Sequence, residues 1–270
     1  MGLFDVIDDI AEKQVMKTET GDNRIFGVVI GQIVKNYDKD MPGRVCVAVP
    51  VRDQNANELQ WARVAMPSSG SKWGHYFLPE AGDQVLLAFE QGNIEKPYVI
   101  GCIPKDNDQI LRTSADEDNQ YKKIVTKNGN TIYFEDNKEG EGDKDKIHIV
   151  TAKGAHRLEL DNEKHQIVLS DEEGKNQLLM KTEDGQMQIK AEKKLTIQVG
   201  ENIELILNGS NGSVQLKSTK VSFEISQTLD LSSNTAMKCK AGNISMEANA
   251  ALKLNSSGLA SLAGTPIKLG

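Results

Sequence analysis

The chain has 270 residues, a formal net charge of −7 and only 5% aromatic residues. The negative charge argues against a nucleic-acid groove and against a basic membrane-binding surface, so we expect no nucleic-acid partner and only transient membrane contact. Cys46, Cys102 and Cys239 are widely spaced and odd in number. They indicate neither a disulfide framework nor a C-x-x-C metal site, and no cofactor or metal is expected.

Residues 1–23 precede the first dense apolar run. Leu3, Ile7 and Ile10 recur at helical spacing, which fits a short helix packed on its own domain or a docking segment for a partner. This terminus lacks the basic segment of a signal peptide, and no apolar run reaches the ~18 residues of a membrane span. We therefore expect cytoplasmic assembly and, for action in an extracellular or injection particle, delivery by a route other than general secretion.

Residues 24–103 carry longer apolar runs, at 25–30, 45–49, 61–65, 85–89 and 98–100, separated by turns that contain Gly and Asp. Five short strands within this length predict a small closed barrel, and a five-stranded OB-fold barrel is our first choice.

The stretch 79–101 has a distinctive pattern of turn residues and apolar residues: Pro79, Gly82, Asp83, Phe89, Gly92, Pro97 and Gly101. It resembles the barrel of contractile-injection spike proteins, a family that includes VgrG proteins of type VI secretion, phage baseplate assembly protein V and the spikes of phage-like bacteriocins. Asn93 stands where the family often has Asp. The resemblance implies a homotrimer in which a barrel is followed by an intertwined β-helical needle.

VgrG proteins carry a large hub domain before the barrel, whereas only about twenty-three residues precede it here. The resemblance is therefore to the short spikes, and it implies a separate hub protein at the N-terminal end. The polar segment 104–121 is too short for an inserted domain, since folded domains have at least ~50 residues, and it is interpreted as a linker.

Residues 122–270 repeat an apolar-polar-apolar triplet at intervals of about eight residues, which predicts short strands with one buried face. No long amphipathic helix is available to cover that face. A slim prism filled from three sides fits better, so we predict an intertwined triple-stranded β-helix, the needle of a trimer. The residues expected in its core are Leu158, Leu160, Met187, Ile189, Leu195, Ile197, Ile203, Leu205, Val214, Leu216, Leu229, Leu231, Leu252 and Leu254. The alternative is a monomeric β-solenoid that serves as an adhesin or glycan-binding module.

His156 and His165 each come two residues before an apolar strand residue. Strand alternation would point them inward, where three copies could hold a water, an anion or a metal; the alternative is that both reach solvent. No H-E-x-x-H, P-loop or dinucleotide-binding pattern occurs, so no catalytic residue is assigned and the protein is not expected to be an enzyme.

The C-terminal segment contains Thr265, Pro266, Ile267, Lys268 and Leu269. It resembles the blunt end of VgrG needles, on which a separate PAAR-repeat cone protein sits, and the resemblance implies such a tip partner. The alternative is a frayed terminus. Between 135 and 146, a charged insertion rich in Gly, Glu and Lys predicts an exposed loop.

Overall fold

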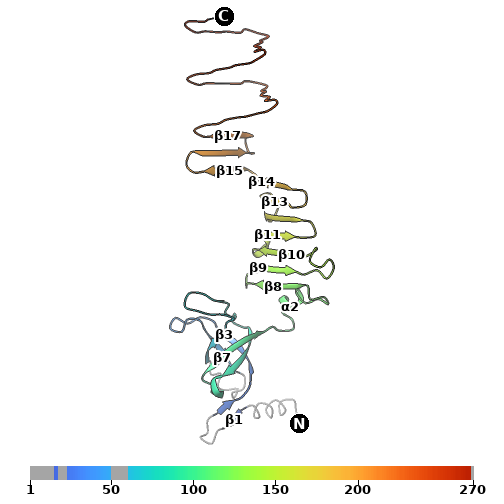
Figure 1. Ribbon diagram of the computed structural model, residues 1–270. Coiled ribbons are helices and arrows are strands. Elements are labelled where there is room, and N and C mark those ends of the chain that lie inside the picture. The colour runs from blue at the N-terminus through green and yellow to red at the C-terminus, as the bar shows by residue number, and fades with distance from the viewer. Residues whose placement is uncertain (1–14, 18–22, 50–59, 269–270) are drawn as a thin grey trace. The chain divides into compact units, whose positions relative to one another are not determined.

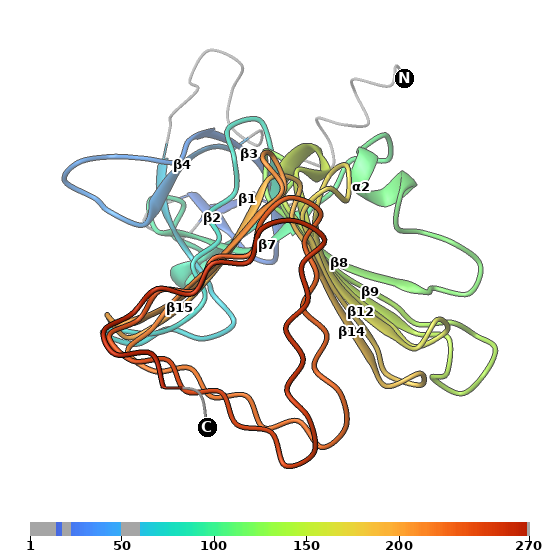
Figure 2. The same cartoon turned by 90° about the horizontal axis from the view of Figure 1, so that it is seen from above.

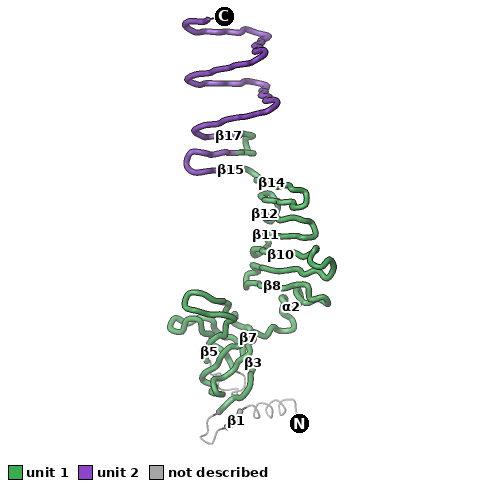
Figure 3. Tube along the Cα trace, in the orientation of Figure 1, with its two compact units in different colours: residues 1–195, 207–213 green, residues 196–206, 214–270 purple. Residues whose placement is uncertain are grey.

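The computed structural model describes residues 15–17, 23–49 and 60–268, whose regular secondary structure is almost entirely β-strand. The predicted all-β class with an N-terminal OB-like barrel is confirmed. The chain divides into two compact units, residues 1–195 with 207–213 and residues 196–206 with 214–270 (Figure 3). Each is described by itself below.

Five strands close the barrel in the order β3-β4-β5-β7-β6: β3 (Val29–Lys35), β4 (Arg44–Ala48), β5 (Gln60–Val64), β6 (Gln84–Phe89) and β7 (Pro97–Ile103) (Figure 1). All neighbouring pairs are antiparallel except β5 and β7. The short 3-10 helix η1 (Glu90–Gly92) joins β6 to β7. Alternate strand residues fill the interior, as expected for a small closed barrel. The buried core consists of Ile25, Val29, Ile33, Val45, Val47, Ala62, Val85, Leu87, Phe89, Ile94 and Val99.

The first predicted barrel strand, 25–30, is wrong. Gly27 has a φ of +103°, a backbone conformation that favours glycine and interrupts an extended strand. The apolar run is therefore split between β2 (Asn23–Ile25), which pairs with β1 (Val15–Lys17), and the barrel strand β3. The predicted docking segment 1–23 lies largely outside the described residues.

Residues 104–120 contain one helical turn, α2 (Gln109–Arg112), where a linker was expected. Seven strands follow in the same unit, and each pairs antiparallel with its neighbours in sequence (Figure 1). Viewed from above, β8, β9, β12 and β14 lie over one another (Figure 2). The ladder consists of β8 (Tyr121–Val125), β9 (Thr131–Glu135), β10 (Lys146–Val150), β11 (His156–Asp161), β12 (Gln166–Asp171), β13 (Gln177–Lys181) and β14 (Gln186–Lys190), with the 3-10 turn η2 (Ala152–Gly154) after β10. The charged insertion forms the loop between β9 and β10.

Beyond this ladder, β15 (Lys194–Val199), β16 (Ile203–Asn208) and β17 (Ser213–Lys217) form a three-stranded sheet in that order. From 218 to 268 the described backbone is extended but has no strand or bridge partner within the chain. In the second unit this extended backbone follows a three-sided path when seen from above (Figure 2). The apolar-polar-apolar triplets of 218–268 therefore have an extended backbone without the pairing that would make them strands.

The barrel core yields a first prediction. Leu87 is fully buried, whereas its neighbour Leu86 faces outward and is half-buried. Leu87→Ala should lower the free energy of unfolding of the barrel by about 3 kcal/mol, and Leu86→Ala by about 1 kcal/mol or less, because only the first leaves an internal cavity. Both tryptophans, Trp61 and Trp73, lie in the barrel segment, so tryptophan fluorescence during urea unfolding reports on the barrel. Equal losses for the two variants would contradict the assignment of these faces.

Candidate subunit interface

One face of the seven-stranded sheet carries two continuous apolar columns. The strand register places Ile149 beside Ile132 and Leu158, and Ile147 beside Phe134 and Leu160. The first column runs Ile124, Ile132, Ile149, Leu158, Leu169, Leu178, Ile189, and the second runs Lys122, Phe134, Ile147, Leu160, Ile167, Met180, Met187. We call this surface the apolar stripe. Lys122 is its one polar member.

The stripe is more exposed in the single chain than the opposite face, which is mostly polar but also holds the buried Val168. On the stripe, Met187 is 67% and Ile189 is 55% exposed. On the opposite, polar face, the side chains of His148 and Glu159 are only 12% and 17% exposed. In a folded domain, an amphipathic sheet normally buries its apolar face. The described part of the chain therefore leaves this apolar stripe largely uncovered.

The predicted core residues fall into three groups. Leu158, Leu160, Met187 and Ile189 belong to the stripe. Leu195, Ile197, Ile203, Leu205, Val214 and Leu216 lie on β15, β16 and β17, and Leu229, Leu231, Leu252 and Leu254 lie on the unpaired extended backbone. In the single chain all fourteen are exposed or half-buried, and the last four are all exposed. Their burial in a trimer stays a prediction.

The polar face is held by side-chain contacts around His148. Its ring stacks on Tyr133, with centroids 4.2 Å apart and planes 9° from parallel. The Glu159 carboxylate lies 3.8 Å from Nδ1, and Nε2 is buried without a hydrogen-bond partner. Burial lowers the pKa of His148, and this effect outweighs the attraction of nearby carboxylates for the protonated ring. The ammonium of Lys123 lies 5.9 Å from the Tyr133 centroid.

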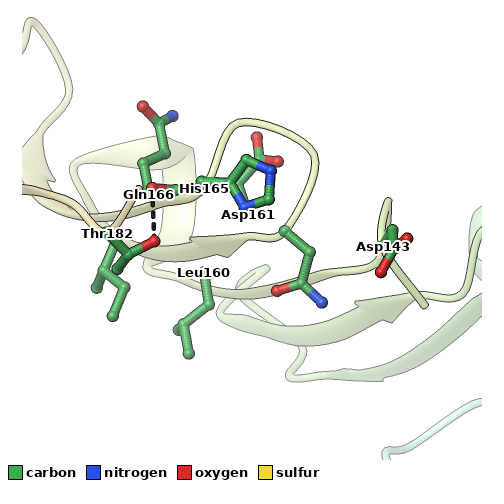
Figure 4. A pocket seen from close by; sticks show the side chains of 8 residues that line it. Asp143, Leu160, Asp161, His165, Gln166 and Thr182 are labelled. Carbon is green, nitrogen blue, oxygen red and sulfur yellow. Dashed lines mark hydrogen bonds between the residues drawn. The ribbon is translucent and has the colours of Figure 1, made fainter. Parts of the chain in front are cut away.

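A recess of about 300 Å³ lies at the turn between β11 and β12 (Figure 4). The Thr182 hydroxyl donates a hydrogen bond of 2.9 Å to the His165 carbonyl. The Asp161 carboxylate is buried and accepts a bond from the Lys164 amide at 3.0 Å. Burial opposes ionisation of Asp161, but the bonds from Lys164 and the charge of Lys146 hold its pKa below the usual value. Within the described ranges, no group of three or more His, Cys, Asp or Glu gathers as a metal site would require. The polar groups that line the recess therefore stabilise the turn between β11 and β12.

Of the two alternatives for His165, the structure fits the one in which the side chain reaches solvent, since it is 55% exposed. His165 is a turn residue with a φ of +49°, so strand alternation does not apply to it. His156 opens β11 opposite Asp171 and shares the face of Leu158, but its side chain is exposed in the single chain.

The barrel motif builds the turns around β6. The Gly82 amide, at a φ of +97°, donates to the Ile33 carbonyl at 2.8 Å, and Asp83 accepts a bond from the Glu80 amide at 2.8 Å. Gly92, at a φ of +80°, is buried where an added Cβ would lie 3.2 Å from the Ile25 carbonyl oxygen. Pro79, Phe89 and Pro97 are buried and Gly101 pairs with Leu86. Each glycine or turn residue of this motif thus has a local backbone role.

Comparison with known proteins identifies this barrel. Residues 29–103 match the family described as the type VI secretion system/phage-baseplate injector OB domain. The chain carries a VgrG-like injector OB domain. It is 32% identical over 79 residues to the type VI secretion system spike proteins VgrG2a and VgrG2b of Pseudomonas aeruginosa, which covers 28% of this chain and 9% and 8% of those relatives.

A longer match is 28% identical over 124 residues to the spike protein VgrG1c of the same organism, which covers 42% of this chain and 17% of the relative. The chain thus spans less than a fifth of the length of each of these VgrG proteins. The match to the injector OB domain includes the whole stretch 79–101, in which the resemblance was found. The family match does not include the ladder or the extended segment that follows it.

The environment of His148 yields a prediction about pH. Because its folded pKa lies below the ordinary value of 6.5, the unfolded chain binds the proton more readily. The free energy of unfolding should therefore fall as pH drops below 6.5 and continue to fall until the folded ring is protonated. His148→Gln should remove this part of the acid sensitivity. An NMR titration of the His148 ring protons with a midpoint at or above 6.5 would contradict the structure.

Proposed function

We propose that this chain is the structural central spike of a contractile injection machine and forms a homotrimer that pierces a target envelope. The observation that supports the proposal best is the apolar stripe, because a stripe uncovered in one chain needs a partner surface of the same width and length. Two further copies supply that surface. Three stripes then face a common axis and form a prism, with the polar faces outward.

The energetic gain is large. Each stripe residue is half-buried or exposed in one chain, and its full burial is worth ~1 kcal/mol or more. Within β8–β14 every strand already has backbone partners in its own chain. Three copies therefore meet there through side chains alone, each contributing one whole sheet to the prism.

Residues 218–268 call for a different arrangement. Their extended backbone lacks strand partners within the described chain, yet they alternate apolar and polar residues. Leu254 is 75% and Phe223 is 74% exposed. Interwound copies would supply both the missing backbone hydrogen bonds and cover for the apolar side chains. The intertwined β-helix predicted for 122–270 is thus proposed for this C-terminal part only.

The alternative of a monomeric β-solenoid has less support. A solenoid stacks its successive coils side by side, so each coil pairs with the next coil of the same chain. The ladder instead is an antiparallel meander, and the described residues 218–268 show no pairing between their turns. An adhesin or glycan-binding role has no further observation in its favour.

The proposed action is mechanical. A needle whose exposed surface is polar has little apolar surface with which to remain in a bilayer, so its contact with a membrane is transient. Among the described helices none is long and apolar enough to cross a membrane. No chemistry is assigned to any residue, and the protein is proposed to work without catalysis or a cofactor.

Two protein partners complete the proposal. A separate hub protein would bind at the N-terminal end, where the injector OB domain lies in the sequence. A PAAR-type cone protein would bind the C-terminal tip. There, Thr265, Pro266, Ile267 and Lys268 are exposed, with Ile267 at 52%, whereas Leu269 lies outside the described residues. Pull-down of each partner by the purified spike tests these assignments.

Adjacent residues of β14 give a matched test of the trimer. Ile189 lies on the stripe and Gln188 on the polar face, and both are exposed in a single chain. In a monomer, lysine at either position should change stability by no more than ~0.5 kcal/mol. In a trimer, Ile189→Lys brings three ammonium groups together in an apolar core and should abolish assembly, while Gln188→Lys should not. Sedimentation measures the outcome: wild type should have about three times the chain mass of 29.7 kDa. A well-ordered wild-type monomer would refute the proposal.

The interwound arrangement can be tested separately by hydrogen exchange. Backbone amides of 218–268 should exchange slowly in the assembled protein, because other copies accept their hydrogen bonds. In the dissociated Ile189→Lys variant the same amides should exchange rapidly, whereas those of the barrel should remain protected. Rapid exchange of 218–268 in the wild-type trimer would mean that these segments are not interwound.

A further inference from the structure

The apolar stripe leaves the relative height of the three copies poorly determined. Its two columns repeat at every strand, about 4.8 Å apart, and apart from Phe134 and Lys122 their side chains are aliphatic or methionine. If one copy slipped by a single strand, its Ile147 and Ile149 would lie at the height of Phe134 and Ile132 of the next copy. Apolar surface would still meet apolar surface. Within the ladder, hydrophobic contact alone therefore does not select one register, even where the proposed winding of 218–268 fixes the register of that segment.

Lys122 breaks this uniformity. It is the first residue of the second column and pairs with Phe134 on β9. Its ammonium donates to the Asn119 carbonyl and lies 3.7 Å from the Asp136 carboxylate, and its side chain is 48% exposed. The charge is thus solvated and partnered at the end of the stripe, where the sheet begins.

A slip in either direction places a Lys122 at the height of a neighbour's Phe134. If one copy moves toward the C-terminal end of the ladder, its own Lys122 rises to that height. If it moves the other way, its Phe134 comes to lie at the height of the Lys122 residues of the two other copies. An ammonium among phenyl and aliphatic side chains loses its water and keeps only the Asp136 carboxylate and Asn119 carbonyl of its own chain, which is unfavourable.

We propose that Lys122 sets the register of the trimer by excluding copies displaced by one strand. The inference rests on the proposed trimer and assigns to one residue of that interface the role of a register determinant. The side chains that Lys122 must stay away from are the Phe134 residues of the two other copies. The Asp136 carboxylate and Asn119 carbonyl hold it in the solvated position.

The test uses Lys122→Leu in the full chain. Leucine extends the apolar column by one position, so trimers should still form but should include displaced copies. Methyl NMR of Met180 and Met187 reports the result, because both lie in the second column. A symmetric trimer gives one resonance per methionine, whereas a displaced copy makes the three chains unequal and splits each resonance.

Wild type, Lys122→Arg and Lys123→Leu serve as comparisons. Lys122→Arg keeps the charge, and Lys123→Leu makes the same chemical change on the polar face, so all three should show single resonances. Splitting confined to Lys122→Leu supports the proposal. Single resonances for Lys122→Leu, or equal splitting for Lys123→Leu, would overturn it. If Lys122→Leu does not give soluble protein, Lys122→Met is measured in its place under the same criteria. A monomeric mass for wild type would instead reject the trimer itself.

Discussion

The central constraint in this molecule is a sheet whose apolar face is more exposed than its polar face. Strand propensity and short turns suffice to fold β8–β14 as a meander within one chain, but they provide nothing to cover the stripe. Its width is two side chains per strand, which suits the narrow axis of the proposed prism. The residues that define strand register within a chain therefore also define the surface that the other copies of the proposed trimer would cover.

The source of the backbone hydrogen bonds changes along the chain. In the barrel and the ladder, each strand finds its partners in the same chain. From 218 onward, the described chain offers no such partners, and the proposed trimer would supply them between copies. A spike built this way has a part that folds locally and a part that can form only on assembly. Local folding first would bring the three C-terminal segments together at high effective concentration, which lowers the entropic cost of winding them.

The sequence predicted the fold class well because it depends on short-range patterns. The period-2 triplets identified stripe members such as Leu158 and Ile189, and the turn residues around Gly82 identified the barrel. The displaced first barrel strand arose from Gly27, whose positive φ interrupts a run that is apolar throughout. For a related reason the sequence left the orientation of His165 open, since alternation does not extend through a turn. Turn lengths decide which residues pair across neighbouring strands. The apolar stripe, and the position of Lys122 in it, could therefore be identified only once the strand register was known.

The ladder of β8–β14 has one further consequence for how such proteins vary. Each strand contacts only its immediate neighbours in sequence, so the sheet behaves as a one-dimensional stack. Insertion or deletion of one hairpin changes its length by two strands, ~9.6 Å, and leaves every other pairing and both columns intact. Natural selection can therefore change the length of such a ladder in discrete steps, without redesign of the barrel or of the C-terminal segment.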